Sequence, residues 1–80
     1  MIVLADNDIR SDGATHLANT PRLAGLEALD LRNNRITDTG ARALAQSPYL
    51  GRLKELRITK NAIRDRSWRL LENRFGDALG

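Results

Sequence analysis

Short runs that alternate apolar and polar residues recur along the chain, and each is followed by a longer stretch with helical spacing. In Leu29–Leu31 the two leucines point to one face of a short strand and Asp30 points to the other. The segment 38–45 then spaces its apolar residues three and four apart, which is the stripe of a helix. Ser47-Pro48 ends that helix, because proline disfavours helical geometry in the residue before it. The pattern predicts a strand, a turn and a helix in that order.

This pattern occurs three times at an interval of 27 residues. Shifting the chain by 27 aligns residues of the same type in all three copies: Asn7, Asn34 and Asn61; Ile9, Ile36 and Ile63; Leu17, Leu44 and Leu71. Each copy has only one apolar face, so the copies must stack to build a core. We therefore expect one domain over residues 1–80, with units at 1–27, 28–54 and 55–80. Its strands should lie parallel and side by side, with the helices along the other edge.

Polar residues at two positions of each unit are predicted to hold the turns together. The equivalent asparagines Asn7, Asn34 and Asn61 stand where the strands end, and their amides can bond the unpaired N–H and C=O groups of the neighbouring turn. We interpret them as a structural asparagine ladder. Ser11, Asp38 and Asp65 stand at the helix starts and are predicted N-caps, which accept hydrogen bonds from the first N–H groups of their own helices.

The third unit departs from the pattern of the other two. Trp68 replaces the small Ala41, and Phe75 stands where Pro48 would be. A large aromatic residue can cover the last core layer only where no further unit packs against it. We interpret Trp68 and Phe75 as a C-terminal cap, and a platform for a nucleotide base is the alternative function of these aromatics.

The run from Leu26 to Leu44, LEALDLRNNRITDTGARAL, resembles the leucine-rich repeat. The resemblance is to its ribonuclease-inhibitor-like class, of bacterial type, in which every unit has a helix, and it extends over essentially the whole chain as a little under three units. It implies an α/β fold, a right-handed solenoid with strands on the concave side and helices on the convex side. Proteins of this kind act as binding scaffolds, which favours a non-enzymatic role in protein–protein interaction.

Charge is unevenly distributed and leaves a second function open. Residues 1–50 carry five Arg and six acidic residues, which gives 5 − 6 = −1, whereas residues 51–80 carry eight Lys or Arg and four acidic residues, which gives 8 − 4 = +4. Electrostatic binding of nucleic acid through this basic third is therefore the alternative function. The basic residues concerned are Arg57, Lys60, Arg64, Arg66 and Arg69. Without cysteines the chain has no disulfides and no Cys-based metal cluster, and a cytoplasmic location is expected.

The stretch DNDIRSDG, residues 6–13, resembles part of a calcium loop but fails the test of the period. Its carboxylates at positions 6, 8 and 12 are replaced in the other units by Asn, Arg, Lys, Ala and Thr. A calcium loop that opens at Asp6 also needs an oxygen ligand fifth, glycine sixth and an acid twelfth, where Arg10, Ser11 and Leu17 stand. The single histidine, His16, has no predicted partner or pocket. We therefore expect no enzyme activity, metal, cofactor or small-molecule substrate.

The strand side chains that point away from the core are the predicted partner-binding residues. They are Val3, Asp30, Arg32, Arg57 and Thr59. Three strands about 4.8 Å apart form only a narrow surface, and the apolar strand Met1–Ala5 has no polar cap before it. We expect the chain to be the C-terminal part of a longer repeat protein, with self-association through the Met1–Ala5 edge as a further way to cover that strand. No segment is long and apolar enough to predict a membrane span.

Overall fold

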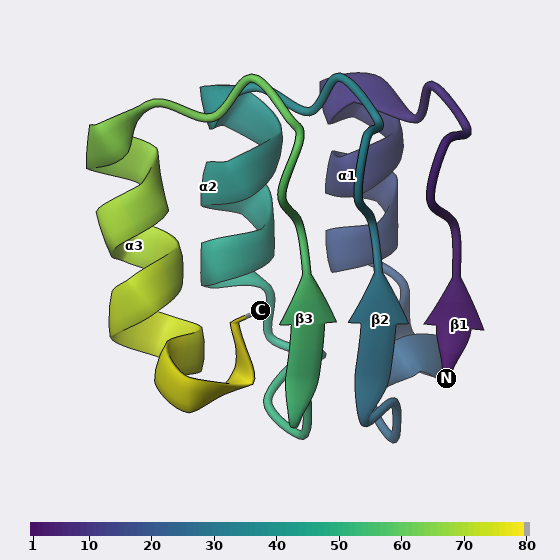
Figure 1. Cartoon of the computed structure of the whole chain (residues 1–80). Coiled ribbons are helices and arrows are strands. Elements are labelled where there is room, and N and C mark those ends of the chain that lie inside the picture. Colours follow the sequence, from purple (N-terminus) through teal and green to yellow (C-terminus); the bar gives the residue numbers. More distant parts are fainter. Residues whose placement is uncertain (80) are drawn as a thin grey trace.

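Three strands and three helices alternate along the chain in the computed structural model, which describes residues 1–79 (Figure 1). They are β1 (Ile2–Val3), α1 (Arg10–Ala18), β2 (Ala28–Asp30), α2 (Asp38–Gln46), β3 (Glu55–Arg57) and α3 (Asp65–Phe75). A 3-10 helix, Pro21–Leu23, follows α1, and a second, Gly76–Ala78, follows α3. None of the helices in residues 1–79 has the length and apolarity needed to span a bilayer.

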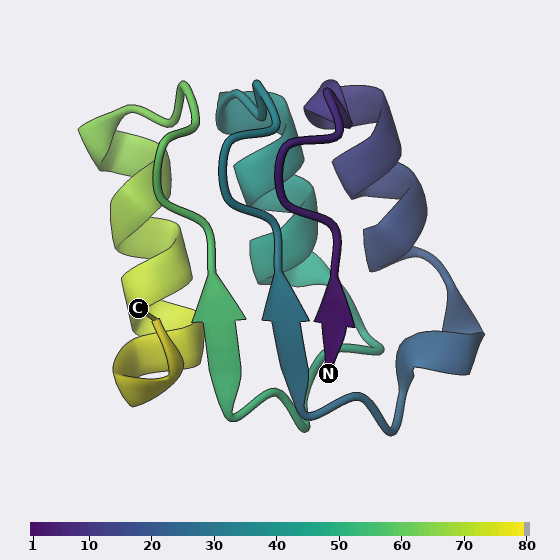
Figure 2. The same cartoon turned by 45° about the vertical axis from the view of Figure 1, so that its right-hand side comes forward.

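The strands form one parallel sheet in the order β1-β2-β3, and the helices all lie against the same face of it (Figures 1 and 2). Ile2 pairs with Leu29, and Leu29 pairs with Leu56, so neighbouring strands are in register at an offset of 27 residues. Each unit therefore repeats the path of the unit before it. The predicted parallel sheet with helices on one side is confirmed.

The core lies between the sheet and the helices and is built mainly from leucine. Its fully buried large apolar side chains are Leu29, Leu31, Ile36, Leu44, Leu50, Leu56, Ile58 and Leu71. Helix α2 approaches α1 closely because Gly40 has no side chain. A Cβ placed at Gly40 would lie 2.7 Å from Cγ2 of Ile36 and 3.1 Å from both the Ala14 Cβ and the Ser11 Cα. The glycine therefore sets the spacing between the first two units.

Each strand leaves the sheet through a turn with left-handed backbone geometry. Asp6, Asn33 and Lys60 occupy equivalent positions and have φ values of 63°, 56° and 57°. Asp and Asn tolerate this region better than other residues with a Cβ. The residue after each turn is one of the equivalent asparagines of the predicted ladder.

The side chain of Asn34 is buried and bonds the backbone of the first unit. Its Oδ1 accepts hydrogen bonds from the N–H groups of Asn7 (2.8 Å) and Ile9 (3.2 Å), and its Nδ2 donates to the carbonyl oxygens of Leu4 (2.8 Å) and Arg32 (3.1 Å). One amide thus satisfies four backbone groups.

Asn61 repeats this arrangement one unit later. Its Oδ1 accepts from the N–H groups of Asn34 (2.9 Å) and Ile36 (3.0 Å), and its Nδ2 donates to Leu31 and to its own strand. Asn7 has no earlier unit to bond within residues 1–79; it is exposed, and its side chain donates only to the carbonyls of Leu4 and Ala5. The bonds therefore run from each asparagine to the unit before it.

The helix starts differ from the sequence prediction. The predicted N-caps Ser11, Asp38 and Asp65 are not the N-cap residues. Those are Ile9, Thr37 and Arg64, and their side chains form no capping hydrogen bond to their own helices. Instead, Ser11 and Asp38 bond the backbone of the next unit. The prediction was wrong because local sequence assigns a polar side chain to its own helix, whereas stacking places it beside the start of the next.

Ser11 accepts hydrogen bonds from the N–H groups of Thr37 and Gly40, both at 3.1 Å, at the start of α2. The Oδ1 of Asp38 accepts from the N–H of Arg64 at 2.8 Å, at the start of α3. That N–H, followed by the hydroxyl of Ser67, holds the pKa of Asp38 below its usual value. Each side chain thus satisfies free N–H groups one unit away.

The C-termini of the helices are bonded by side chains of the following unit. The hydroxyl of Ser47 donates to the carbonyl of Ala18, the last residue of α1. At the equivalent position of the third unit, Nη1 of Arg74 donates to the carbonyls of Leu44 (3.3 Å) and Ala45 (3.0 Å) near the end of α2. The units are therefore joined at both ends of their helices as well as at the sheet.

Replacing Ser11 by alanine should lower the free energy of unfolding by about 1 kcal/mol, the usual cost of losing an N-cap. Replacing Thr37, the N-cap residue of α2 itself, by alanine should cost less, because its hydroxyl bonds no N–H of its own helix. Urea denaturation followed by circular dichroism measures both. A larger loss for Thr37→Ala than for Ser11→Ala would contradict capping from the neighbouring unit.

The chain returns to the sheet after α3. Phe75 is buried in the core, Gly76 turns the backbone with a φ of 48°, and Leu79 forms a parallel bridge with Leu56 of β3. The offset between those two leucines is 79 − 56 = 23 residues, so this return is shorter than the 27-residue period. Trp68 is half-buried against the same end of the core.

Candidate functional site

The face of the sheet that points away from the helices is the candidate site, and we call it the open sheet face. It consists of every second residue along the strands and their extensions: Ala28 and Glu55; Val3, Asp30 and Arg57; Ala5, Arg32 and Thr59. The pairing continues beyond the strands, because the N–H of Asp6 bonds the carbonyl of Arg32 and that of Asn33 bonds the carbonyl of Thr59. The residues therefore form regular rows across the three units.

A bidentate ion pair lies at the centre of the open sheet face. Nε and Nη2 of Arg32 donate to Oδ1 (2.9 Å) and Oδ2 (2.8 Å) of Asp30, and the N–H of Arg32 also donates to Oδ1 (3.1 Å). The Asp30 side chain is only 2% exposed, whereas that of Arg32 is 44% exposed. Asp30 therefore positions Arg32, and only the arginine is accessible to a partner.

A second pair lies on the adjacent strand. Nε and Nη2 of Arg57 both lie 2.8 Å from Oε1 of Glu55, and both side chains are partly exposed. Sequence reasoning did not include Glu55, although it stands two residues before Arg57 and strand alternation places it on the same face. The other predicted residues of this face, Val3 and Thr59, are exposed. The open sheet face thus presents two oriented guanidinium groups alongside the exposed side chains of Val3 and Thr59.

The pKa of Asp30 lies below its usual value of 3.8, chiefly because the guanidinium of Arg32 donates hydrogen bonds to the carboxylate. A lowered folded-state pKa means that the ionised carboxylate stabilises the fold above about pH 4, and that this contribution is lost as the pH falls through the folded-state pKa. The free energy of unfolding of wild type should therefore exceed that of Asp30→Asn at neutral pH, and the difference should shrink in acid below about pH 4. Urea denaturation of both proteins across this range measures it. A difference that is independent of pH would contradict a role for the charge.

Two of the three aspartates of the stretch 6–13, Asp6 and Asp8, form contacts within the molecule. Asn33 donates to Oδ1 of Asp6, and Oδ1 of Asp8 lies 3.1 Å from Nε of Arg10 and 3.5 Å from Nε of Arg35. A hollow of about 280 Å³ lies between Asp6, Asp8, Asn33 and Arg35. Within residues 1–79, no group of three or more His, Cys, Asp or Glu side chains is placed to hold a metal ion.

The other basic residues named by the sequence do not gather into one site with Arg57. Lys60, Arg64, Arg66 and Arg69 are exposed, and they lie on the turn after β3 and on α3. Arg57 is already paired with Glu55. His16 is exposed on α1, and within residues 1–79 its imidazole forms no hydrogen bond to another group. Within residues 1–79, His16 therefore has no side-chain partner that would orient it as a base, and Arg57 is held by Glu55.

Comparison with known protein families finds a match in the middle of the chain. Residues 26–45 match the family model described as Leucine Rich repeat. This segment is therefore similar to a leucine-rich repeat. The searches of curated proteins and of solved structures found no significant match.

The matched segment covers β2 and all but the last residue of α2. It includes Asp30 and Arg32 of the open sheet face and Asn34, whose amide bonds the first unit. Leucine-rich repeats generally serve as scaffolds for protein interaction and are generally not enzymes. Their repeated strands present an extended surface for a partner.

Proposed function

We propose that the protein is a non-enzymatic scaffold that binds a protein partner through the open sheet face. The observation that supports this most strongly is the pair of guanidinium groups on adjacent strands, each held by a carboxylate two residues earlier. Held arginines lose little conformational freedom on binding and can donate to carboxylates of a partner. The partner proposed here presents acidic or carbonyl groups to this face.

We further propose that the three units follow the ribonuclease-inhibitor-like class of leucine-rich repeats, as a right-handed solenoid with the open sheet face on the concave side. The helix in every unit and the 27-residue offset support this assignment. On this proposal, further units would extend the rows of the open sheet face in the same register.

A binding partner is first captured on the immobilised protein and purified. The test then compares how tightly two double variants bind this purified partner. Arg32→Glu with Arg57→Glu reverses both charges of the open sheet face, whereas Arg22→Glu with Arg42→Glu makes the same change at exposed positions elsewhere. We expect the first to weaken binding about tenfold or more, as loss of a central anchor does, and the second to leave binding unchanged. Equal effects of the two double variants would contradict the proposal.

A bulky substitution keeps this test independent of the ion pairs. Thr59→Arg adds a large side chain to an exposed position of the open sheet face without removing a partner from Asp30 or Glu55. It should also weaken binding while leaving the denaturation curve unchanged. Full binding by Thr59→Arg would show that the partner uses another surface. Binding to unrelated RNA that weakens steeply with salt would instead favour the nucleic-acid alternative.

Self-association through β1 is a second candidate, supported by the exposed apolar residues at this edge. Met1 is 62% exposed and Val3 is 61% exposed, and β1 has a neighbour on one side only among residues 1–79. Exposed apolar edges favour pairing with another chain. Light scattering should then give a mass above 8.9 kDa that falls to the monomer value in Val3→Lys. An identical mass for both proteins would argue against it.

A further inference from the structure

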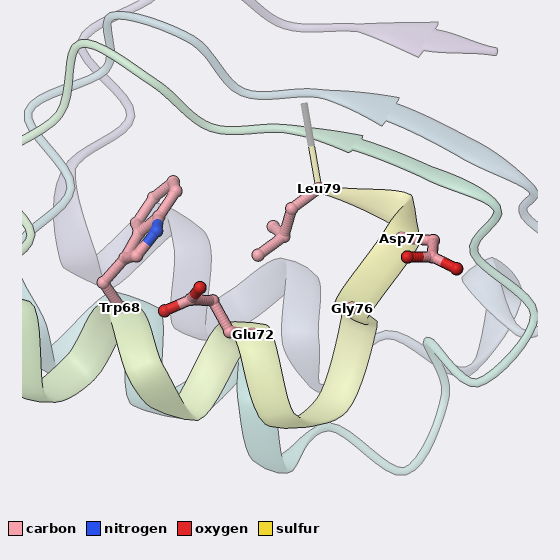
Figure 3. Close-up of a pocket in the computed structure, with 5 residues that line it drawn as sticks. All are labelled: Trp68, Glu72, Gly76, Asp77 and Leu79. Atoms are coloured by element: carbon pink, nitrogen blue, oxygen red, sulfur yellow. The ribbon is translucent and has the colours of Figure 1, made fainter.

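A groove lies at the outer side of α3, away from the open sheet face. It is lined by Trp68, Glu72, Gly76, Asp77 and Leu79 and has a volume of about 490 Å³ (Figure 3). The two hollows beside the strand exits are smaller, at about 280 and 200 Å³. The groove joins the only tryptophan of the sequence to two carboxylates.

The groove exists because the third unit breaks the pattern at two points. Ala14 lies against α2, close to Gly40, and Ala41, one period later, is fully buried. Trp68, two periods after Ala14, places an indole where a small side chain allows the next helix to approach. Leu79 meanwhile lies beside Leu56. Trp68 and Leu79 therefore leave a groove between them at this end of the core.

The two sides of the groove differ in chemistry. Figure 3 shows the indole of Trp68 and the side chain of Leu79 facing each other, with the carboxylate of Glu72 between them and directed towards the indole. Asp77 lies at the far end of the groove, beyond Leu79. Within residues 1–79, neither Glu72 nor Asp77 takes part in an ion pair, although 51–80 carry an excess of basic residues. The nearby Arg74 is turned towards the carbonyls of α2 instead.

We propose that this groove binds an arginine side chain of a partner protein. The guanidinium stacks on the indole of Trp68 and pairs with the carboxylate of Glu72, while its aliphatic stem contacts Leu79. A planar guanidinium suits this combination because it stacks on aromatic faces and donates to carboxylates in a fixed geometry. A nucleotide base could also stack on Trp68, but its phosphate would be repelled by Glu72 and Asp77. The site is separate from the open sheet face and does not depend on the function proposed for it.

Trp68 itself reports on binding. The probe is a short acetylated peptide with one arginine among alanines, and its control is the same peptide with citrulline, which has the shape of arginine without the charge. Titration is followed by Trp68 fluorescence and by the NMR signal of its indole N–H. We expect a saturable change with the arginine peptide in the millimolar range, as for a single exposed cation on an aromatic ring, and no saturable change with citrulline or with adenosine monophosphate.

Three variants decide which groups are responsible. Glu72→Gln should weaken binding of the arginine peptide about threefold, as expected for loss of one exposed ion pair. Asp77→Asn should have a smaller effect in the same direction. Asp65→Asn removes the same charge from an exposed position on α3 outside the groove and should leave binding unchanged.

Several results would overturn the proposal. These are an indole signal that does not respond to the arginine peptide, equal responses to arginine and citrulline, or a Glu72→Gln protein that binds as tightly as Asp65→Asn. A saturable response to adenosine monophosphate alone would assign the groove to a nucleotide instead.

Discussion

Replacing Asn34 by alanine is expected to lower the free energy of unfolding by about 3 kcal/mol, because it leaves several buried backbone groups without partners. The amide accepts from the N–H groups of Asn7 and Ile9 and donates to the carbonyls of Leu4 and Arg32. Asn34 is fully buried, so water does not replace these bonds without opening the structure. Urea denaturation followed by far-ultraviolet circular dichroism measures the loss.

Asn7 is the matched control for this variant. It is the same residue type at the equivalent position of the first unit, but it is exposed and its side chain bonds only Leu4 and Ala5 of its own unit. Asn7→Ala should cost about 0.5 to 1 kcal/mol, the net value of ordinary hydrogen bonds. Equal losses for Asn7→Ala and Asn34→Ala would contradict the view that each asparagine holds the unit before it.

Replacing Gly40 by leucine should destabilise the protein by about 3 kcal/mol, at the upper end of the usual cost of overpacking. Its Cβ alone would meet Ile36 at 2.7 Å, Ala14 at 3.1 Å and the backbone of Ser11 at 3.1 Å. A backbone atom cannot rotate away as a side chain can, so α1 and α2 must separate. The hydrogen bond from the Gly40 N–H to Ser11 would be lost with that separation.

Gly51→Leu provides the control, because nothing lies within 4 Å of a Cβ at Gly51. This variant should unfold at nearly the same urea concentration as wild type. A small loss for Gly40→Leu, similar to that for Gly51→Leu, would show that the first two units do not depend on this close approach.

The sequence predicts the repeating architecture well, because stacking requires the same residue types at the same positions of every unit. The alternation around Leu29 and Leu31 predicts the strand, and the 27-residue shift from Leu29 to Leu56 predicts the register that the sheet shows. Such predictions succeed because each unit meets the same neighbours. A residue therefore has the same surroundings wherever the pattern recurs.

The sequence fails where a side chain bonds a unit other than its own. Ser11 looks like the cap of α1, yet it bonds the N–H groups of Thr37 and Gly40. Local rules of helix capping contain no information on which helix lies nearest in space. Only the distance between stacked units decides this.

In the candidate site, too, the sequence predicts the positions of residues on the sheet but not the contacts of their side chains. Alternation correctly places Asp30 and Arg32 on one face, but burial of Asp30 and its bidentate bond to Arg32 depend on side-chain packing. The groove at α3 was missed for a related reason. Helical spacing places Glu72 beside Trp68 on α3, but the other side of the groove forms only when the chain returns to Leu56 through Leu79.

Native-state hydrogen exchange of the turn amides tests the central claim most directly, namely that stacked units bond one another through their asparagines. The amides of Asn7, Ile9, Asn34 and Ile36 all donate to an asparagine Oδ1 of the next unit. The equivalent amides of Asn61 and Ile63 have no hydrogen-bond acceptor within residues 1–79. The first four should exchange slowly and together, while Asn61 and Ile63 should exchange rapidly. Equal exchange rates at all six amides would contradict the stacked arrangement.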